Sequence, residues 1–500
     1  MIKNILSNWS SLIISTIAVF ILYPYCVQVL GEEQYGVWLL ISSITGYFSL
    51  LQLGVPMANV RFISQYYACN EMEKVNEVVS TNFAFFAMMG LLTFIVGSGL
   101  SFVIDVIFKV PPELKSMARV ATIVASLNIG LSFAFEVFEG LLNALQQFVF
   151  FNLVKNVIVI VRVCITFFVL QYDNGLVALA WILTLATVIQ AGLFYTYIRI
   201  RYPVICISSN KISISVLKKV SGYSIFILIF LFASKISFNT DAMVISRVIS
   251  VSAIVLFTVA NNFLIYLSQF IVGISDALMP KISGLSAIGN QTNLKDIYLH
   301  LSKLVCFLLL PICLTFFFFG GDFIALWMGE KYRLVSGNIL SILTLSYLFF
   351  LVQRGVAFPI MMGTSHVRFP TILMLMTALM NLLLSIWWGK VYGIYGVAWG
   401  TTVPNLVSTA GIIWYMLRTF NVHCHTYLYR GILIPLSSGV FFAVPGLISH
   451  KYILVDSYLK FTMVVSVSIV VYFCFLHLLY LEQREKNLLA HFLAPLRIKC

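Results

Sequence analysis

Charged side chains occur in segments of this chain that are otherwise apolar enough to cross a membrane. The bases are Arg61, Lys155, Arg162, Lys235 and Arg354, and the acids are Glu136, Glu139 and Asp241. A single charge at the bilayer centre costs about 2.5–3.5 kcal/mol on insertion scales, so each needs a partner of opposite charge or a wet cavity. The embedded charge is net positive, and a cavity of that sign suits an anionic ligand such as a pyrophosphate.

Spacing along two neighbouring apolar segments predicts which of these charges meet. Glu136 and Glu139 lie on one side of a helix at 3.6 residues per turn, as do Lys155 and Arg162 on the next. A turn near Gln146 brings Glu139 and Lys155 to similar depth, so we expect a structural ion pair between them. Because Arg162 lies two turns deeper and has no acid at its depth, we expect it to line the cavity.

The remaining embedded charges leave alternatives open. Arg61 and Arg354 each lie a turn or two inside the end of an apolar segment, so they could line the cavity or extend to the headgroups. Lys235 and Asp241 are six residues apart on one helix and do not face each other, so both are expected to point into the bundle. Asp241 and Glu136 are the candidates for coupling to an ion or proton gradient.

The elements that hold these charges are membrane helices. The 500 residues are 61% hydrophobic and only 10% charged, whereas a soluble domain is about a quarter charged. Apolar stretches of about 20 residues recur along the chain, and in lipid such stretches must be helical to satisfy their backbone groups. The fold class is therefore an all-α integral membrane protein.

Neither the net charge nor the cysteines indicate another class of protein. The formal charge of +13 comes mostly from bases in short loops on one side of the membrane, so we expect no nucleic-acid partner. The nine cysteines lie largely in apolar segments without metal-ligand spacing, so they are interpreted as small buried side chains. No metal site, cofactor or catalytic residue is predicted.

Hydropathy predicts about fourteen spans, at 9–30, 37–58, 81–107, 117–140, 149–170, 176–198, 219–239, 250–274, 299–320, 336–358, 369–389, 394–417, 430–449 and 459–481. The first continues without a small-residue cleavage site, so it is expected to be retained. The loops on the same side of the membrane as the N-terminus hold nearly twice as many basic residues as the loops on the other side. Lys303 is counted with the N-terminal side. The positive-inside rule then puts both termini in the cytoplasm.

A weak internal similarity predicts the domain organisation. Residues 57–78 follow the second span and residues 279–300 follow the eighth, and each segment runs from a Met through small and polar residues to an Asn followed by a Lys. Similar segments six spans apart indicate a parallel repeat. We expect six-helix lobes at 1–207 and 208–422, and two additional helices with a cytoplasmic tail at 423–500.

Five segments in order resemble the Wzx-type polysaccharide flippases. They are VLGEEQYGVW (Val29–Trp38), LLQLGVPMANVRFIS (Leu50–Ser64), FNTDAMVISRVIS (Phe238–Ser250), FIALWMGEKY (Phe323–Tyr332) and YGIYGVAWGT (Tyr392–Thr401). Gln52 replaces an acid common in the second segment, and Asp241 matches the acid of the third. The resemblance extends to about residue 420 and does not include the last two spans.

This resemblance implies a fold and a function. Such flippases belong to the multidrug/oligosaccharidyl-lipid/polysaccharide exporter superfamily and have two six-helix lobes around a central cavity. They move undecaprenyl-pyrophosphate-linked oligosaccharide from the cytoplasmic to the periplasmic leaflet of the bacterial inner membrane, for O-antigen or capsule assembly. By matching position, Arg61 is their cavity-lining arginine of the second span. A polysaccharide polymerase and a chain-length regulator are the protein partners to expect.

Two alternatives compete with a flippase. A polyprenyl-linked glycosyltransferase or polymerase is also polytopic, but it usually needs a sizeable outer loop or domain, and every predicted outer loop is short. A multidrug or cation antiporter of the same superfamily would prefer an acidic cavity, whereas the embedded charge is basic. The sequence therefore favours a carrier of an anionic lipid-linked saccharide over an enzyme.

Overall fold

The computed structural model describes residues 2–52, 55–172, 175–220, 225–288, 291–364, 368–453 and 455–481, and every regular element in these ranges is a helix. Within these described ranges, eleven helices are long and apolar enough to cross a membrane. The predicted class of all-α, multi-pass membrane protein is confirmed. Contacts divide the chain into two compact units, Met1–Val255 and Leu256–Cys500.

The predicted count of fourteen spans stays a prediction. Ser7–Gln52 and Arg368–Thr419 each cover two of the predicted spans. Their helices, α1 (Ile2–Gly46) and α13 (Arg368–Thr419), contain non-helical glycines at Gly31 (φ 77°) and Gly393 (φ 62°). Glycine adopts positive φ at little steric cost, so each is two helices joined at a glycine.

The first unit begins with α1 and contains eleven further helices among the described residues, up to α9. They are η1 (Tyr47–Gln52), α2 (Val55–Ala68), α3 (Met72–Ser101), α4 (Ile104–Ile107), η2 (Pro112–Leu114), α5 (Lys115–Ala144), α6 (Phe148–Val169), α7 (Gly175–Arg201), η3 (Ser209–Lys211), α8 (Ile214–Val220) and α9 (Ile225–Val248). The predicted seventh span, 219–239, corresponds to α9.

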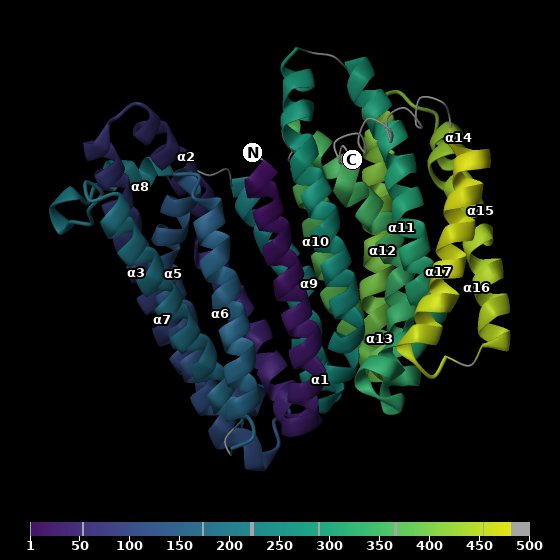
Figure 1. The fold of residues 1–500 in the computed structure, drawn as a ribbon, viewed down its shortest axis with the longest axis horizontal. Coiled ribbons are helices and arrows are strands. Elements are labelled where there is room, and N and C mark those ends of the chain that lie inside the picture. The colour runs from purple at the N-terminus through teal and green to yellow at the C-terminus, as the bar shows by residue number, and fades with distance from the viewer. Residues whose placement is uncertain are drawn as a thin grey trace, which may run out of the picture. The chain divides into compact units, whose positions relative to one another are not determined.

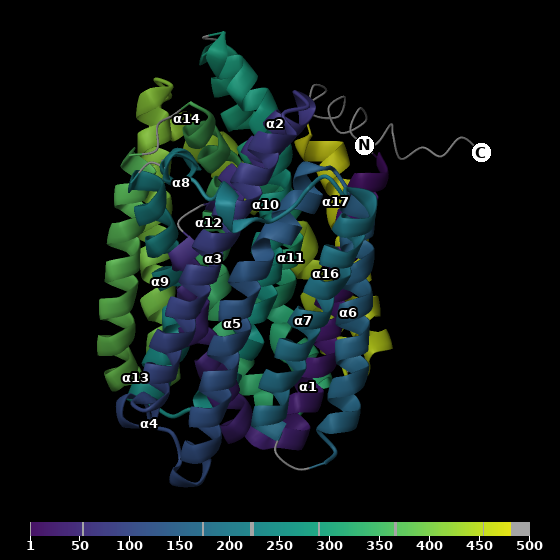
Figure 2. The ribbon, with the colours of Figure 1, turned by 90° about the vertical axis from the view of Figure 1, so that its left-hand side faces the viewer.

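Helix α5 is central to this unit, with α3 and α7 packed along it, as Figure 2 shows. A Cβ added at Gly90 of α3 would collide with the backbone of Gly130 on α5. Small residues allow membrane helices this close approach. Phe86, Val137 and Phe194 complete the buried interior between these helices. On the other side of the unit α6 packs against α1.

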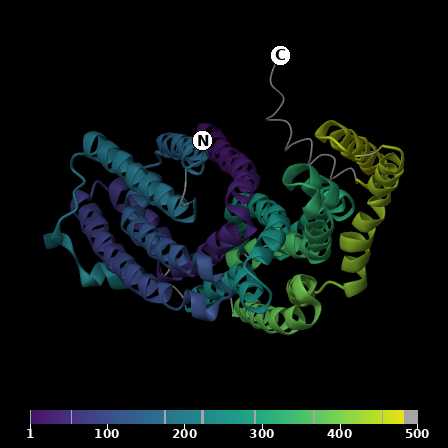
Figure 3. The same cartoon turned by 90° about the horizontal axis from the view of Figure 1, so that it is seen from below.

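The second unit consists of the remaining helices, of which Figure 1 labels α10 to α17. They are α10 (Ser252–Ala287), α11 (Gln291–Met328), η4 (Glu330–Tyr332), α12 (Arg333–Gly363), α13, α14 (Cys424–Tyr427), the π-helical η5 (Leu428–Leu433), α15 (Ile434–Ser438), α16 (Val440–Tyr452), α17 (Tyr458–Phe475) and the π-helical η6 (Leu476–Tyr480). Helix α12 packs between α11 and α13. Helices α16 and α17 form a pair that contacts α11, and Figure 3 shows the two side by side. The domain boundaries predicted at 207 and 422 remain predictions.

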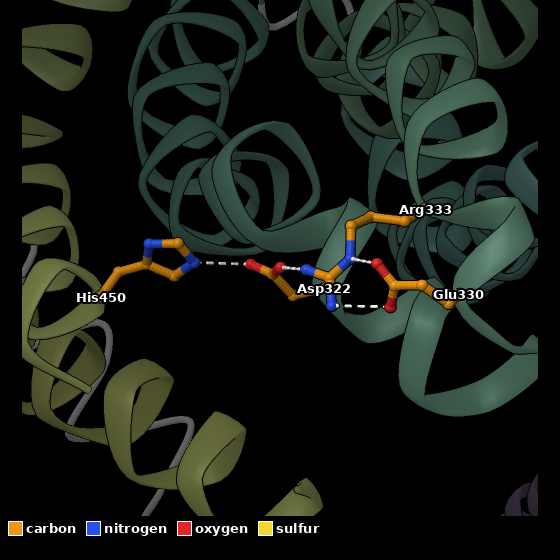
Figure 4. Close-up of polar contacts among 4 residues, drawn as sticks. All are labelled: Asp322, Glu330, Arg333 and His450. Carbon is orange, nitrogen blue, oxygen red and sulfur yellow. Dashed lines mark hydrogen bonds and ion pairs between the residues drawn. The ribbon is translucent and has the colours of Figure 1, made fainter. Parts of the chain in front are cut away.

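One polar network ties this C-terminal pair to the rest of its unit (Figure 4). The Asp322 carboxylate at the end of α11 accepts from the Arg333 guanidinium, and its Oδ2 lies 2.7 Å from His450 Nε2 at the end of α16. Arg333 Nε also donates to Glu330 Oε1 at 2.6 Å. Asp322 thus joins α11 to both α12 and α16.

Replacing Asp322 by alanine should lower the thermal unfolding temperature of the detergent-purified protein. Asp322 is only 9% exposed, and hydrogen bonds to charged groups contribute about 1.5–3 kcal/mol when partly buried. Asp456→Ala is the matched control, because that carboxylate pairs with Lys460 at 2.7 Å with both side chains exposed and such pairs contribute about 0–1 kcal/mol. Equal shifts for the two variants would show that the network does not hold the helix pair.

Candidate functional site

Arg61 lies on α2, a helix that polar contacts fix to its neighbours. Asn82 Nδ2 on α3 donates to Asn59 Oδ1 at 2.7 Å, and Ser64 Oγ donates to the Ala144 carbonyl at 3.1 Å. Asn59 is fully buried whereas Arg61 is exposed. The guanidinium carbon lies 6.0 Å from the centroid of the Phe62 ring. Among the described residues no acid forms a salt bridge with Arg61, so its charge is available to an anion.

The two acids of α5 are half-buried in the first unit. Gln190 Nε2 on α7 donates to Glu139 Oε1 at 2.9 Å. Lys155 on α6 is exposed, and its ammonium lies 5.6 Å from the centroid of the Phe151 ring. Both partners of the predicted ion pair therefore have other contacts, and the salt bridges found among the described residues do not include that pair. The role of Glu136 in ion coupling remains a prediction.

Arg162 lies at the edge of the face that α6 packs against α1. Asn152 Nδ2 donates to Asn8 Oδ1 at 2.6 Å, and the Tyr25 hydroxyl donates to the Phe167 carbonyl at 2.8 Å. Arg162 is half-buried, and within the described ranges no salt bridge reaches it. Its expected role in lining the cavity stays a prediction.

Helix α9 carries Lys235 and Asp241. Within the first unit it is joined to α1 by a hydrogen bond from Ser43 to the Asn239 carbonyl, and to η1 by a hydrogen bond between the hydroxyls of Tyr47 and Thr240. Asp241 is 5% exposed, whereas Lys235 is half-buried. The expectation that both side chains point into the bundle stays a prediction. Their proposed roles in ion coupling and anion binding are untested.

Arg354 belongs to the second unit and lies half-buried on α12. Its neighbour Gln353 is 2% exposed and bridges two buried tyrosines. The Tyr298 hydroxyl donates to Gln353 Oε1 at 3.2 Å, and Gln353 Nε2 donates to the Tyr427 hydroxyl at 2.8 Å. This triad of Tyr298, Gln353 and Tyr427 fixes the part of α12 from which Arg354 projects.

Sequence reasoning missed one buried cation. Lys303 on α11 is 5% exposed, and its ammonium lies 5.8 Å from the centroid of the Phe307 ring. It was counted with the loops although it falls four residues inside the predicted span 299–320. Its depth in that span was the signal that could have found it.

An ion cluster marks one end of α5 in the first unit. Arg119 donates to both oxygens of Asp105 at 3.0–3.1 Å, and Lys115 Nζ lies 3.7 Å from Asp105 Oδ2. The hydrogen bonds from Arg119 hold the pKa of the Asp105 carboxyl below its usual range. No group of three or more His, Cys, Asp or Glu in the described part of the chain could hold a metal ion.

Comparison with known proteins decides the family. The model of the polysaccharide biosynthesis protein family matches residues 1–286, more than half of the chain. The chain belongs to this family. The matched region includes Arg61, Glu136, Arg162, Lys235 and Asp241.

Two related proteins align with this chain over most of their length. The chain is 22% identical over 452 residues to "Uncharacterized membrane protein EpsK" of Bacillus subtilis (strain 168), covering 88% of this chain and 87% of that protein. It is 20% identical over 426 residues to "Putative O-antigen transporter" of Shigella flexneri, covering 84% and 99%. Among solved structures, the lipid II flippase MurJ in an inward closed conformation has a TM-score of 0.70 at 18% identity, covering 96% of this chain and 99% of that one. The structural likeness supports the fold.

Proposed function

We propose that this member of the family is a flippase. It moves undecaprenyl-pyrophosphate-linked oligosaccharide repeat units from the cytoplasmic to the periplasmic leaflet of the bacterial inner membrane, for O-antigen or related surface polysaccharide. The observation that carries the proposal is the family match over residues 1–286, a region that contains four of the five embedded bases. Alignment with 99% of the protein named as an O-antigen transporter supports the same function.

The physical task explains the residues involved. A pyrophosphate and its sugars are too polar to cross an apolar slab, whereas the lipid tail can stay in the bilayer. Arginine binds phosphate oxygens through two parallel N–H groups, so Arg61, Arg162 and Arg354, with Lys235, are proposed to receive the pyrophosphate. No bond of the substrate needs to be made or broken, so the proposed function is not enzymatic.

Transport by alternating access requires a source of energy. The two lobes are proposed to open first to the cytoplasm and then to the periplasm, with a gradient of ions or protons coupled through Asp241 or Glu136. Asp241 is buried and Glu136 half-buried, and carboxylates in such places mark ion pathways in membrane proteins. Both termini are proposed to be cytoplasmic, with a polymerase and a chain-length regulator as partners.

Deletion of the gene in its own bacterium tests the function. Surface polymer should fall sharply, and lipid-linked oligosaccharide should accumulate where only reagents admitted to the cytoplasm can reach it. A plasmid copy should restore both. Normal polymer in a deletion strain that has no second flippase would contradict the proposal.

Flipping by the purified protein provides a direct measurement. In proteoliposomes loaded with a pyrophosphate-linked oligosaccharide on a polyprenyl chain, the sugar should become accessible to an external glycosidase faster than in protein-free vesicles. If a cationic drug were transported instead of the lipid-linked sugar, the antiporter alternative would replace the flippase.

A further inference from the structure

The second unit contains a cavity of about 870 Å³ between α12, α13 and the segment that follows α13. Its polar residues gather where α13 ends, at Arg418, Asn421 and His423. Its other walls are mainly apolar and include Phe349, Leu406, Ile413, Leu428 and Ile432. The cavity is therefore amphipathic along its length, with a cation at one end. None of its lining residues belongs to the proposed pyrophosphate site.

The cavity has the depth of one leaflet. Leu406 and Arg418 both line it and lie twelve residues apart on α13. At 1.5 Å per residue this is about 18 Å along the helix, slightly more than half of a hydrocarbon core of about 30 Å. Because α13 is long and apolar enough to cross the membrane, the cavity runs from the membrane surface towards the middle of the bilayer.

The charged end is arranged for an anion. The Arg418 guanidinium carbon lies 5.6 Å from the centroid of the Trp414 ring, one turn deeper on the same helix. Cation–π contacts of this kind hold a guanidinium in place, and tryptophan is typical of the boundary between lipid and water. Arg418 is exposed and forms no salt bridge with any described acid. Its charge is free to bind a phosphate at that level.

A second polar group lies deeper in the cavity. Thr409 lines it, is 4% exposed, and its hydroxyl has no hydrogen-bond partner among the described residues. Buried hydroxyls normally have a partner. Thr409 lies five residues below Trp414, or about 8 Å along the helix. Phospholipids carry ester carbonyls just below the phosphate, and these are acceptors for such a hydroxyl. A polyprenyl phosphate has none.

We propose that the cavity binds one anionic phospholipid of the surrounding membrane. Its phosphate contacts Arg418, an ester carbonyl accepts from Thr409, and one acyl chain follows the apolar wall to Leu406. Basic pockets between membrane helices are known binding sites for anionic headgroups. The site is separate from the proposed flippase activity, since no residue of the cationic cavity takes part. The lipid would fill the space of about 870 Å³ that α13 and η5 line together.

Retention of phosphatidylglycerol by the purified full-length protein tests this proposal. The protein is incubated with mixed micelles of phosphatidylglycerol and phosphatidylcholine and then washed in detergent. Mass spectrometry should then find about one phosphatidylglycerol bound per chain. Arg418→Gln removes the cation, and Ala410→Trp fills the cavity from a lining position. Each should weaken retention about tenfold or more, since one charge-assisted hydrogen bond contributes about 1.5–3 kcal/mol. Thr409→Val should weaken it less, and Arg418→Lys should keep most of it.

Two matched controls separate this site from general effects of charge and bulk. Arg430→Gln removes an exposed base near the cavity that does not line it, and Val407→Trp adds the same bulk at a half-exposed position of α13 outside the lining. Both should retain the lipid as the parent protein does. Size-exclusion profiles of all variants show whether they fold, and because Arg418 is exposed its replacement should leave folding intact.

Several outcomes would overturn the proposal. The proposal is wrong if the protein retains phosphatidylcholine as well as it retains phosphatidylglycerol. It is also wrong if Arg430→Gln loses as much phosphatidylglycerol as Arg418→Gln does, or if inorganic phosphate alone occupies the site in place of the lipid. Displacement of phosphatidylglycerol by a polyprenyl phosphate at equal concentration would assign the cavity to the carried lipid instead. These measurements involve no transport, so failure of the flippase tests would leave their result unchanged.

Discussion

Arg61→Ala is expected to reduce surface polymer in a flippase-deficient strain about tenfold to a hundredfold relative to the parent protein at matched expression. The reason is electrostatic. Arg61 is exposed and forms no salt bridge in the described part of the chain, so its charge is free for the pyrophosphate. A charge-assisted hydrogen bond contributes about 1.5–3 kcal/mol, and each 1.4 kcal/mol changes affinity about tenfold.

Three further variants sharpen this test. Arg61→Lys should retain part of the activity, because the charge remains but the two parallel N–H groups are lost. Arg162→Ala should also reduce polymer if the half-buried Arg162 faces the ligand. Arg199→Ala, an exposed base at the end of α7, should have little effect. If Arg61→Ala and Arg162→Ala both restore polymer fully, the cationic cavity is not the pyrophosphate site.

Hydropathy predicted the helical class because apolar stretches of about 20 residues have the length of a membrane helix, which satisfies its own backbone groups in lipid. It did not predict where one span divides. The predicted span 37–58 is a helix to Gly46, a 3₁₀ segment to Gln52 and a separate helix from Val55. Pro56 suits the first turn of a new helix, where its missing N–H group costs nothing. Hydropathy averages over about 20 residues and does not detect such a local break.

The charges of the candidate site can be read from the sequence, but the contacts of these side chains cannot. Periodicity placed Glu139 and Lys155 at similar depth, yet Gln190 from a third helix is the partner of Glu139. Residues 51 positions apart in the chain cannot be paired from the spacing within two helices. For the same reason the sequence did not predict the contact between Asp322 and His450, which are 128 positions apart in the chain. Charge and depth can be read from one segment, whereas partners depend on how helices pack.

The buried triad of Tyr298, Gln353 and Tyr427 gives the largest expected effect on stability. All three side chains are at most 2% exposed, and the two tyrosine rings stack with centroids 5.2 Å apart. Gln353→Leu leaves both hydroxyls without the amide, and each unsatisfied buried group costs about 1–3 kcal/mol. The variant should therefore unfold at a clearly lower temperature in detergent than the parent protein.

A triple variant separates loss of the hydrogen bonds from loss of packing. Replacing both partners of a buried hydrogen bond by apolar groups of similar shape is often nearly neutral, so Gln353→Leu combined with Tyr298→Phe and Tyr427→Phe should regain most of the lost stability. The stacked rings remain in that variant, and both tyrosine hydroxyls are gone. If the triple variant unfolds at a lower temperature than Gln353→Leu alone, the triad contributes through the net strength of its hydrogen bonds. If Gln353→Leu has no effect, the bridge between α11, α12 and α14 does not hold these helices together.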